Sequence, residues 1–379
     1  MTSFLKKILK TVFPVVLLKQ LFLIYNKFRI STIDKLLFPE YRVATKEFQL
    51  YRIGYPFREN DIDVSEITDD TVRSYMNKWF DWTQEEFILK FDKGCLIEPD
   101  HGWAIVGRRT LLYFSLGISR TLFLPRPRFF RLLFFPVVER LSSAISLRDT
   151  GEENYFHFYN DVLTKLYLLQ ANKVAIEEVP IVISRKLWDK PYFQFYRSKN
   201  SLFRKLKWVV QDRQYIEVKQ AWFCKALTHP PLLFKKIFTP LSVKATLSER
   251  VFVTRNKNRL RHLVNTTEVE QLFRGFGFQI IDADNLSVEK QMQCFANAGF
   301  IAGIHGAGLT NIAFREVPGK VLEIFPYPTE GYLPFHYIML AKMKMFSYQA
   351  IIGERNKNAF QNGFFVDIHK LNSAIECMI

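Results

Sequence analysis

The last third of the chain alternates short apolar runs with helix-like segments, and this alternation constrains the fold more than any other feature. Four runs have the length of a buried strand: VFVTR at 251, FQII at 278, FIAGI at 300 and VLEIF at 321. Strands of this length separated by single helices build a right-handed parallel sheet. The pattern predicts a Rossmann-like α/β domain over residues 245–345, followed by a C-terminal segment at 346–379.

Capping residues support the helices between these runs. Thr266 or Thr267 is expected to cap the helix after the first run, and Ser287 the helix before the third. The sequence DADN at 282–285 contains two aspartates in a metal-binding spacing, but its position favours a strand-to-helix turn.

A glycine-rich loop follows the third run, within GFIAGIHGAGLTNIAFREVPGKVLEIFP at 299–326. Gly306 and Gly308 allow close approach of the backbone and positive φ, so the amides from Ala307 to Thr310 can point at an anion. The carboxyl edge of a parallel sheet is where ligands bind, and a diphosphate fits this loop. Glycines that only permit tight strand-to-helix packing are the structural alternative.

Polar side chains around the loop extend this expectation. His305 is expected to hydrogen-bond the phosphate or a sugar hydroxyl, and Glu323 to accept hydrogen bonds from ribose hydroxyls. Arg255 ends the first run, at the carboxyl end of the expected strand, and Arg261 lies in the basic sequence that follows; guanidinium groups there make bidentate phosphate contacts. A solvated basic loop is the alternative.

In the first half, ENYFHFYNDVLTKLYLL places His157 and Asp161 four residues apart, on one face of a helix that Asn154 caps. Such a pair can remove the proton of an attacking hydroxyl, with either residue as the base. A structural polar contact is the alternative. The antiparallel strands expected near 95–112 are joined at Pro99 to Gly102.

The length and net charge of the chain limit its domain organisation and its binding partners. With 379 residues the chain exceeds one core, so we expect a first α/β domain at 42–228 and a proline-rich linker at 229–244. The formal net charge of +16 requires an anionic partner, either a nucleic acid, an acidic membrane surface or a phosphorylated substrate. Four widely spaced cysteines indicate neither a zinc site nor a disulfide framework.

The N-terminal residues 1–30 interleave lysines with large apolar residues too often for a spanning helix. They predict an amphipathic helix in the interface of an anionic membrane, and an ordinary helix packed on the body is the alternative. The stretch LPRPRFFRLLFFP at 124–136 is a second candidate basic membrane contact.

Two blocks together resemble glycosyltransferase family 61, whose bacterial members serve capsule and cell-surface polysaccharide pathways. One is NYFHFYNDVLTKL, and the other runs from VFVTRNKNRLRHLVN through FIAGIHGAGLTNIAF to VPGKVLEIFP. By this resemblance the nucleotide-sugar site consists of Arg255, Arg261, His305, Gly306, Ala307, Gly308, Leu309, Thr310, Asn311 and Glu323. His157 and Asp161 are the implied catalytic residues, and Asn154 lies on the acceptor side.

The resemblance implies a GT-B fold, in which two Rossmann-like domains face each other across a cleft. It further implies an inverting transferase that needs no metal or other cofactor and moves a sugar, with UDP as the expected nucleotide, to a lipid-linked glycan. A cytoplasmic enzyme, peripheral on the inner face of the membrane, fits the basic N-terminus. Nucleic acid is not expected as a partner. The alternatives are a non-catalytic basic module that binds nucleic acid or anionic lipid, and a GT-B-like epimerase or pyruvyl transferase.

Overall fold

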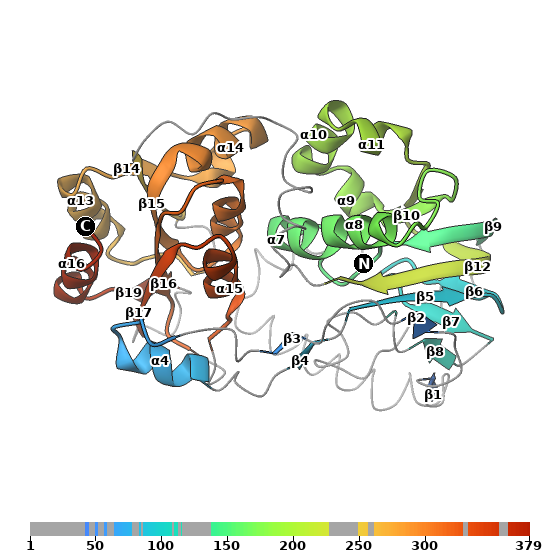
Figure 1. Ribbon diagram of the computed structural model, residues 1–379, viewed down its shortest axis with the longest axis horizontal. Helices are drawn as coiled ribbons and strands as arrows, with labels where there is room; N and C mark the ends of the chain where they lie inside the picture. Colours follow the sequence, from blue (N-terminus) through green and yellow to red (C-terminus); the bar gives the residue numbers. More distant parts are fainter. Residues whose placement is uncertain are drawn as a thin grey trace, which may run out of the picture.

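The computed structural model describes residues 42–44, 50–51, 57–58, 64–77, 83–84, 86–107, 110–112, 115, 138–226, 249–256, 261–328, 333–355 and 363–379. These residues form two α/β units, each built on a sheet with parallel strands, that lie side by side (Figure 1). The mixed α/β class is confirmed. The predicted helix at 1–30, the basic stretch at 124–136 and the linker at 229–244 lie outside the described residues.

The second unit contains a five-stranded sheet in which every neighbouring pair is parallel. Its strand order is β14-β13-β15-β16-β17. Four strands confirm the predicted runs: β13 (Glu249–Val253), β14 (Gln279–Ile281), β15 (Ala298–Ile304) and β16 (Lys320–Phe325). The fifth strand, β17 (Ser347–Ile352), comes from the predicted C-terminal segment and forms an edge of the same sheet.

This strand order defines where a ligand can bind. The chain enters the sheet at β13, adds β14 on one side and then crosses to the other side to add β15. The two connections leave the neighbouring strands β13 and β15 in opposite directions, so a crevice opens outside their carboxyl ends. The segment that begins at Thr254 and the loop that begins at His305 both start at this switch point.

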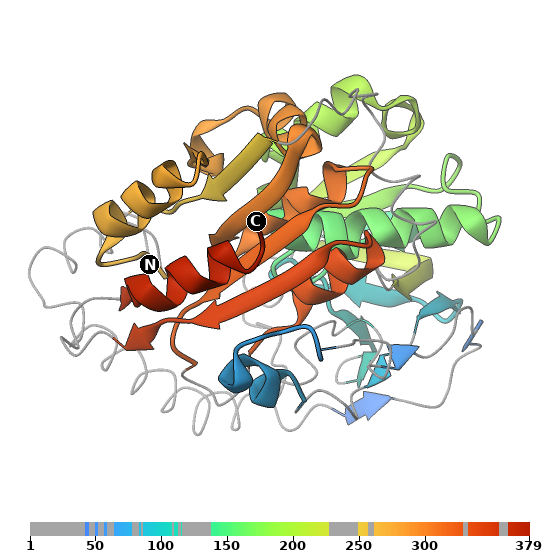
Figure 2. The same cartoon turned by 60° about the vertical axis from the view of Figure 1, so that its left-hand side comes forward.

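Helices cover both faces of the second sheet. Helix α13 (Thr266–Gly275) and helix α16 (Ile368–Glu376) pack on one face, where Figure 2 shows α16 running along the strands. The other face carries α14 (Val288–Asn297), the 3-10 helix η7 (Ala307–Phe314) and α15 (His336–Met343). This second face is turned toward the first unit (Figure 1).

The predicted caps of these helices have different outcomes. Ser287 caps α14, because its hydroxyl accepts a hydrogen bond from the amide of Lys290 at 3.3 Å. The prediction for α13 is wrong: the helix begins after Asn265 without a side-chain cap, and the Thr266 hydroxyl instead donates to a carbonyl at 2.6 Å. The DADN turn is confirmed as η6 (Ala283–Asn285), which Asp282 caps.

The first unit has a mixed sheet. Parallel neighbours form one side of it: β12 (Tyr215–Lys225), β9 (Val138–Ser146), β10 (Ile181–Ser184) and β11 (Trp208–Gln211). The other side is largely antiparallel and includes β5 (Phe87–Phe91), β6 (Cys95–Ile97), β7 (Ala104–Val106) and β8 (Thr110–Leu112). The predicted turn from Pro99 to Gly102 does join two antiparallel strands. Two short strands also belong to this sheet: β1 (Arg42–Ala44) and β2 (Leu50–Tyr51). Two separate two-stranded sheets pair β3 (Phe57–Arg58) with β4 (Thr83–Gln84) and β18 (Glu354–Arg355) with β19 (Phe364–Phe365).

A long helical segment leads away from the carboxyl end of β9. It begins as α7 (Tyr155–His157), continues as the π-helix η5 (Phe158–Leu163) and ends as α8 (Thr164–Ala171). Three shorter helices follow in the same unit: α9 (Arg185–Trp188), α10 (Pro191–Lys199) and α11 (Ser201–Lys205). A π-turn inside an α-helix often marks a functional site, and here it begins directly after His157 and contains Asp161.

Helix α4 (Asp70–Met76) belongs to the first half of the chain but packs on the second unit (Figure 1). Its N-terminal region is held there by an ion pair of 2.6 Å between Lys370 Nζ and Asp69 Oδ2. The amide of Thr68 also donates to Gln349 Oε1 at 2.9 Å. Part of the range 42–228, predicted as the first domain, therefore packs on the second unit.

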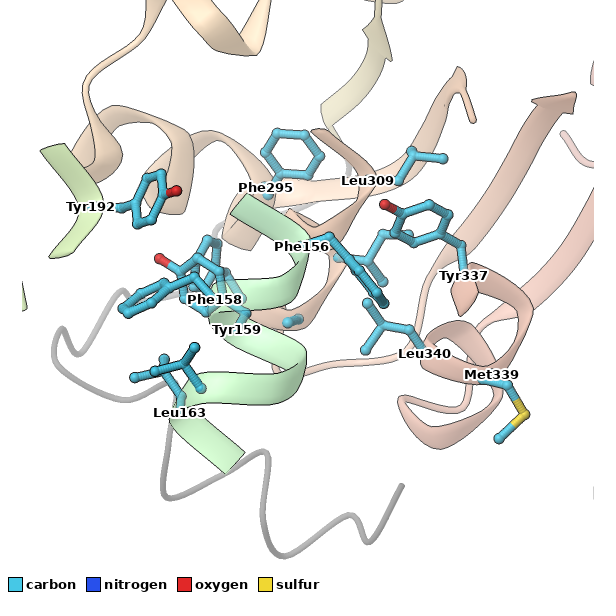
Figure 3. Close-up of a cluster of buried hydrophobic side chains, with 14 of the residues drawn as sticks. Phe156, Phe158, Tyr159, Leu163, Tyr192, Phe295, Leu309, Tyr337, Met339 and Leu340 are labelled. Atoms are coloured by element: carbon cyan, nitrogen blue, oxygen red, sulfur yellow. The ribbon is translucent and has the colours of Figure 1, made fainter. Parts of the chain in front are cut away.

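The two units share one hydrophobic core at their boundary. Figure 3 shows Phe156 pointing from α7 toward Tyr337 and Leu340 of α15. The rings of Phe156 and Tyr337 meet edge to face with centroids 5.7 Å apart, and Tyr159 meets Phe314 of η7 at 5.6 Å. This packing fixes the helix that carries His157 against η7, which continues the glycine-rich loop, and against α15.

Candidate active site

Gly306 and Arg255 meet at the switch point of the second sheet. Gly306 has φ +154° and ψ 179°, a conformation that is open almost only to glycine. A Cβ atom at Gly306 would lie 1.5 Å from Arg255 Nη2, so the guanidinium group rests on the glycine backbone. The structure thus brings together the loop and the arginine that the sequence predicts as an anion site.

Gly308 has a different role from the expected one. The prediction of a positive φ is wrong for Gly308, because it lies in ordinary helical backbone within η7. A Cβ atom there would lie 3.0 Å from Val253 Cγ1, so this glycine permits the close packing of η7 on β13. Both interpretations of the glycines therefore apply, one at each position.

Leu309, Thr310 and Asn311 turn their side chains into the protein, with exposures of 0%, 2% and 0%. Their predicted contacts with the donor are thus restricted to backbone groups. Asn311 Oδ1 accepts a hydrogen bond from the Tyr155 hydroxyl at 2.7 Å, and its amide nitrogen donates to Gln291 Oε1 at 3.0 Å. Asn311 therefore joins the glycine-rich loop to α7 of the first unit. Ala307 and Gly308 remain partly exposed.

Glu323 and His305 form a buried polar chain behind the loop. Glu323 is fully buried, and its Oε1 contacts His305 Nδ1 while its Oε2 accepts a hydrogen bond from the Tyr348 hydroxyl at 2.5 Å. The expected contact of Glu323 with a ribose is wrong for this geometry, because both of its oxygens are buried and engaged. The carboxyl group instead orients His305.

Burial keeps this pair without net charge. Burial raises the pKa of Glu323 to about 8, although the Tyr348 hydrogen bond and the charge of Arg261 oppose the rise. Burial, with the charges of Arg261 and Arg255, lowers the pKa of His305 well below its ordinary value. The two side chains therefore share one proton near neutral pH, and the positive charge at the loop comes from the arginines.

Arg261 lies close enough to influence this pair and has a left-handed backbone conformation, with φ +63°. Such a conformation is uncommon outside glycine and concentrates at functional sites. Residues 257–260, which connect it to the segment of Arg255, lie outside the described residues. The structure therefore places both predicted arginines beside His305.

His157 and Asp161 also meet as the sequence predicts. Asn154 begins the helix, with its side chain accepting a hydrogen bond from the amide of Phe156 at 2.9 Å. His157 Nδ1 and Asp161 Oδ2 are 2.6 Å apart, and the two side chains are 27% and 22% exposed. This hydrogen bond leaves Nε2 of the imidazole as the nitrogen that can accept a proton from a substrate.

Charges around the pair separate the roles of its members. Burial would raise the pKa of Asp161, but the hydrogen bond and charge of His157, with Lys165 and Lys225, lower it to about 2. Burial would lower the pKa of His157, yet its contact with Asp161 and the nearby carboxylates of Asp149 and Glu153 raise it above its ordinary value. Asp161 is therefore a weak base, whereas His157 has the basicity that proton removal at neutral pH requires.

His336 is a site residue that the sequence reasoning missed. It is the first residue of α15, exposed to solvent, and its ring lies 4.8 Å from that of Phe156 by centroids. Burial first, then the charges of His305 and His157, lower its pKa to about 3, while Asp161 raises it. A histidine that follows a strand of the ligand-binding sheet was the available signal, but the segment after β16 has no glycine-rich motif to draw attention to it.

Residues 155–322 match the sequence model of the family described as Glycosyltransferase 61. Over these residues, which make up less than half of the chain, the protein is similar to that family. The match begins with α7 and ends within β16, so it contains both the His157–Asp161 pair and the glycine-rich loop. A search of curated proteins found no match. The protein is a glycosyltransferase, which implies a nucleotide sugar as donor and a glycan as acceptor.

Two further observations concern only the described residues. Among them, no three histidine, cysteine, aspartate or glutamate side chains cluster in a way that could hold a metal ion. No helix in the same part of the chain is both long and apolar enough to cross a membrane.

Proposed function

We propose that the protein is an inverting glycosyltransferase of polysaccharide assembly. It transfers a sugar from a nucleotide diphosphate sugar, with UDP as the expected nucleotide, to a hydroxyl of a lipid-linked glycan of a capsule or cell surface. The observation that carries the proposal is the placement of the Arg255 guanidinium on Gly306 at the switch point of a parallel sheet.

On the donor side, Arg255 and Arg261 bind the diphosphate together with amides at the start of η7. Arginine suits this role because its planar group can donate two parallel hydrogen bonds to phosphate oxygens. The charge that develops on the departing diphosphate is then stabilised by fixed positive groups. Independence from a metal ion stays a prediction, and transfer that persists in EDTA would support it.

On the acceptor side, His157 is the proposed base and Asp161 orients it. The acceptor hydroxyl oxygen attacks the anomeric carbon of the sugar while its proton passes to His157 Nε2. The bond between the anomeric carbon and the phosphate oxygen breaks, and the diphosphate leaves with its electron pair. One such displacement inverts the configuration. Asp161 stabilises the imidazolium that forms, because it is a carboxylate 2.6 Å from Nδ1.

The GT-B arrangement and the cellular location belong to the same proposal. The two sheets and the shared core between the helices that carry the proposed base and the donor loop support two facing domains. Residues 1–30 supply the proposed contact with the inner face of the membrane, which would place the enzyme beside a lipid-linked acceptor. Neither alternative from the sequence, a non-catalytic basic module or an epimerase or pyruvyl transferase, agrees with the glycosyltransferase domain.

Thermal unfolding with a panel of nucleoside diphosphates tests the donor side. A ligand at 100 times its Kd stabilises the folded state by about 2.7 kcal/mol, so a bound nucleotide raises Tm with concentration. We expect UDP to raise Tm more than UMP does, because the arginines and loop amides bind the second phosphate.

The control variant is Arg255→Gln, which should lose most of this gain for UDP and little of the smaller gain for UMP. A wild-type protein whose Tm responds to no nucleoside diphosphate would contradict the proposed function.

A further inference from the structure

His336 lies between the two halves of the proposed site. It begins α15 in the second unit, yet its ring packs against Phe156, the residue that precedes His157 in the first unit. The next residue, Tyr337, meets the ring of His305 with centroids 5.4 Å apart. His336 therefore contacts the neighbour of the proposed base, and its own neighbour contacts the histidine that begins the donor loop.

Electrostatics support the same placement. His336 lies close enough to His305, His157 and Asp161 for each of them to influence its pKa. The side chain is exposed to solvent, so a ligand can reach it. Its pKa of about 3 keeps the imidazole neutral, so it offers one hydrogen-bond donor and one acceptor.

Direct transfer requires a particular order of groups. The transferred sugar must lie between the diphosphate, bound at Arg255 and Gly306, and the acceptor hydroxyl at His157 Nε2. A side chain that lies near both of these positions lies near the sugar as well. From this juxtaposition we propose that His336 hydrogen-bonds a hydroxyl of the transferred sugar and helps to select the donor; the inference rests on the proposed function.

Other roles for His336 fit less well. A neutral imidazole carries no charge to pair with a diphosphate, and His157, with a carboxylate 2.6 Å from its Nδ1, is the stronger base. Ring packing on Phe156 requires an aromatic ring, but it does not require nitrogen atoms. A neutral group with one donor and one acceptor matches a sugar hydroxyl, which both accepts and donates.

The experiment compares His336→Phe and His336→Asn with wild type. His336→Phe keeps a ring against Phe156 and removes both hydrogen bonds, whereas His336→Asn keeps a donor and an acceptor. The control is His369→Asn, an exposed histidine on α16, which covers the opposite face of the sheet. For each protein we would measure the Kd of UDP, and kcat and KM with UDP-glucose, UDP-galactose and UDP-N-acetylglucosamine.

We expect His336→Phe to bind UDP with a Kd within about twofold of wild type. Its kcat/KM for the preferred donor should fall about 3- to 10-fold, the value of one neutral hydrogen bond, and its preference over a donor that differs at one hydroxyl should shrink by a similar factor. His336→Asn should recover part of the kcat/KM and part of the donor preference, and His369→Asn should match wild type in both quantities.

Two results would overturn the inference. One is unchanged kcat/KM and donor preference in His336→Phe, which would show that the nitrogens do not contact the sugar. The other is an equal loss of UDP and UDP-sugar affinity, which would assign His336 to the nucleotide side. Failure of the proposed function is distinguishable, because wild type itself would then neither bind UDP nor transfer sugar from any of the three donors.

Discussion

Replacing Asp161 by asparagine tests whether Asp161 is itself the base or only orients the base His157. The 2.6 Å contact with Asp161 raises the pKa of His157, whose ordinary value is 6.5. As a base, His157 works only when unprotonated, so activity should fall as the pH drops through this raised pKa. Asparagine removes the charge that raises it, and burial then dominates. The acid limb of the pH profile should therefore move to lower pH in Asp161→Asn.

The expected loss of kcat in Asp161→Asn follows from the pKa of the Asp161 carboxylate. The pKa of Asp161 falls from 3.8 to about 2 against the opposing effect of burial, and His157 is the largest cause of the fall. At 1.36 kcal/mol per pH unit this corresponds to roughly 2 to 3 kcal/mol by which the surroundings, His157 first among them, favour the charged form of Asp161. The same charge stabilises the imidazolium in the transition state. Its loss should lower the plateau of kcat about 50- to 100-fold.

The assay is the release of UDP from a UDP-sugar in the presence of acceptor, measured as kcat/KM from pH 5 to 9, with the Kd of UDP as a control. The Kd should stay within about twofold, because Asp161 is not part of the donor side. His157→Gln should lose transfer at least as strongly and should show no acid limb in this range. If wild-type activity is flat down to pH 5 and Asp161→Asn loses nearly all transfer, then Asp161 itself is the base and our reasoning is refuted.

Three other predictions test the donor loop, the buried pair and the N-terminus. Gly306→Ala adds a methyl group 1.5 Å from Arg255 Nη2 at a φ that alanine rarely adopts. The Kd of UDP should therefore rise at least tenfold while the circular dichroism spectrum stays unchanged. An unchanged Kd would argue against diphosphate binding at the loop. Glu323→Ala leaves buried partners such as the Tyr348 hydroxyl unsatisfied and should lower the free energy of unfolding in urea by about 1–3 kcal/mol. Glu323→Gln should lower it less, and equal losses in the two variants would show that the hydrogen bonds contribute little. Deletion of residues 1–30 should abolish salt-sensitive sedimentation with anionic vesicles. It should also lower transfer to a lipid-linked acceptor but not to a water-soluble analogue. Full sedimentation of the truncated protein would show that the membrane contact lies elsewhere in the chain.

Much of the second unit is determined by local sequence. The strands β13 to β16 appear as apolar runs because both faces of a parallel sheet are buried, and such runs are visible without knowledge of their neighbours. Ser287 and Asn154 cap helices as predicted, since a cap depends on a few adjacent residues. The contact between His157 and Asp161 follows in the same way from a spacing of one helical turn.

Only the tertiary structure decides which groups meet and which face solvent. The sequence places Glu323 at a strand end, but its burial between His305 and Tyr348 depends on β17, an edge strand that arrives later in the chain. Gly306 and Gly308 read alike in the sequence, and they differ because one lies under Arg255 and the other against β13. His336 gains its position from Phe156, 180 residues earlier. Long-range packing, which sets burial and therefore charge, has no local signature in a single sequence.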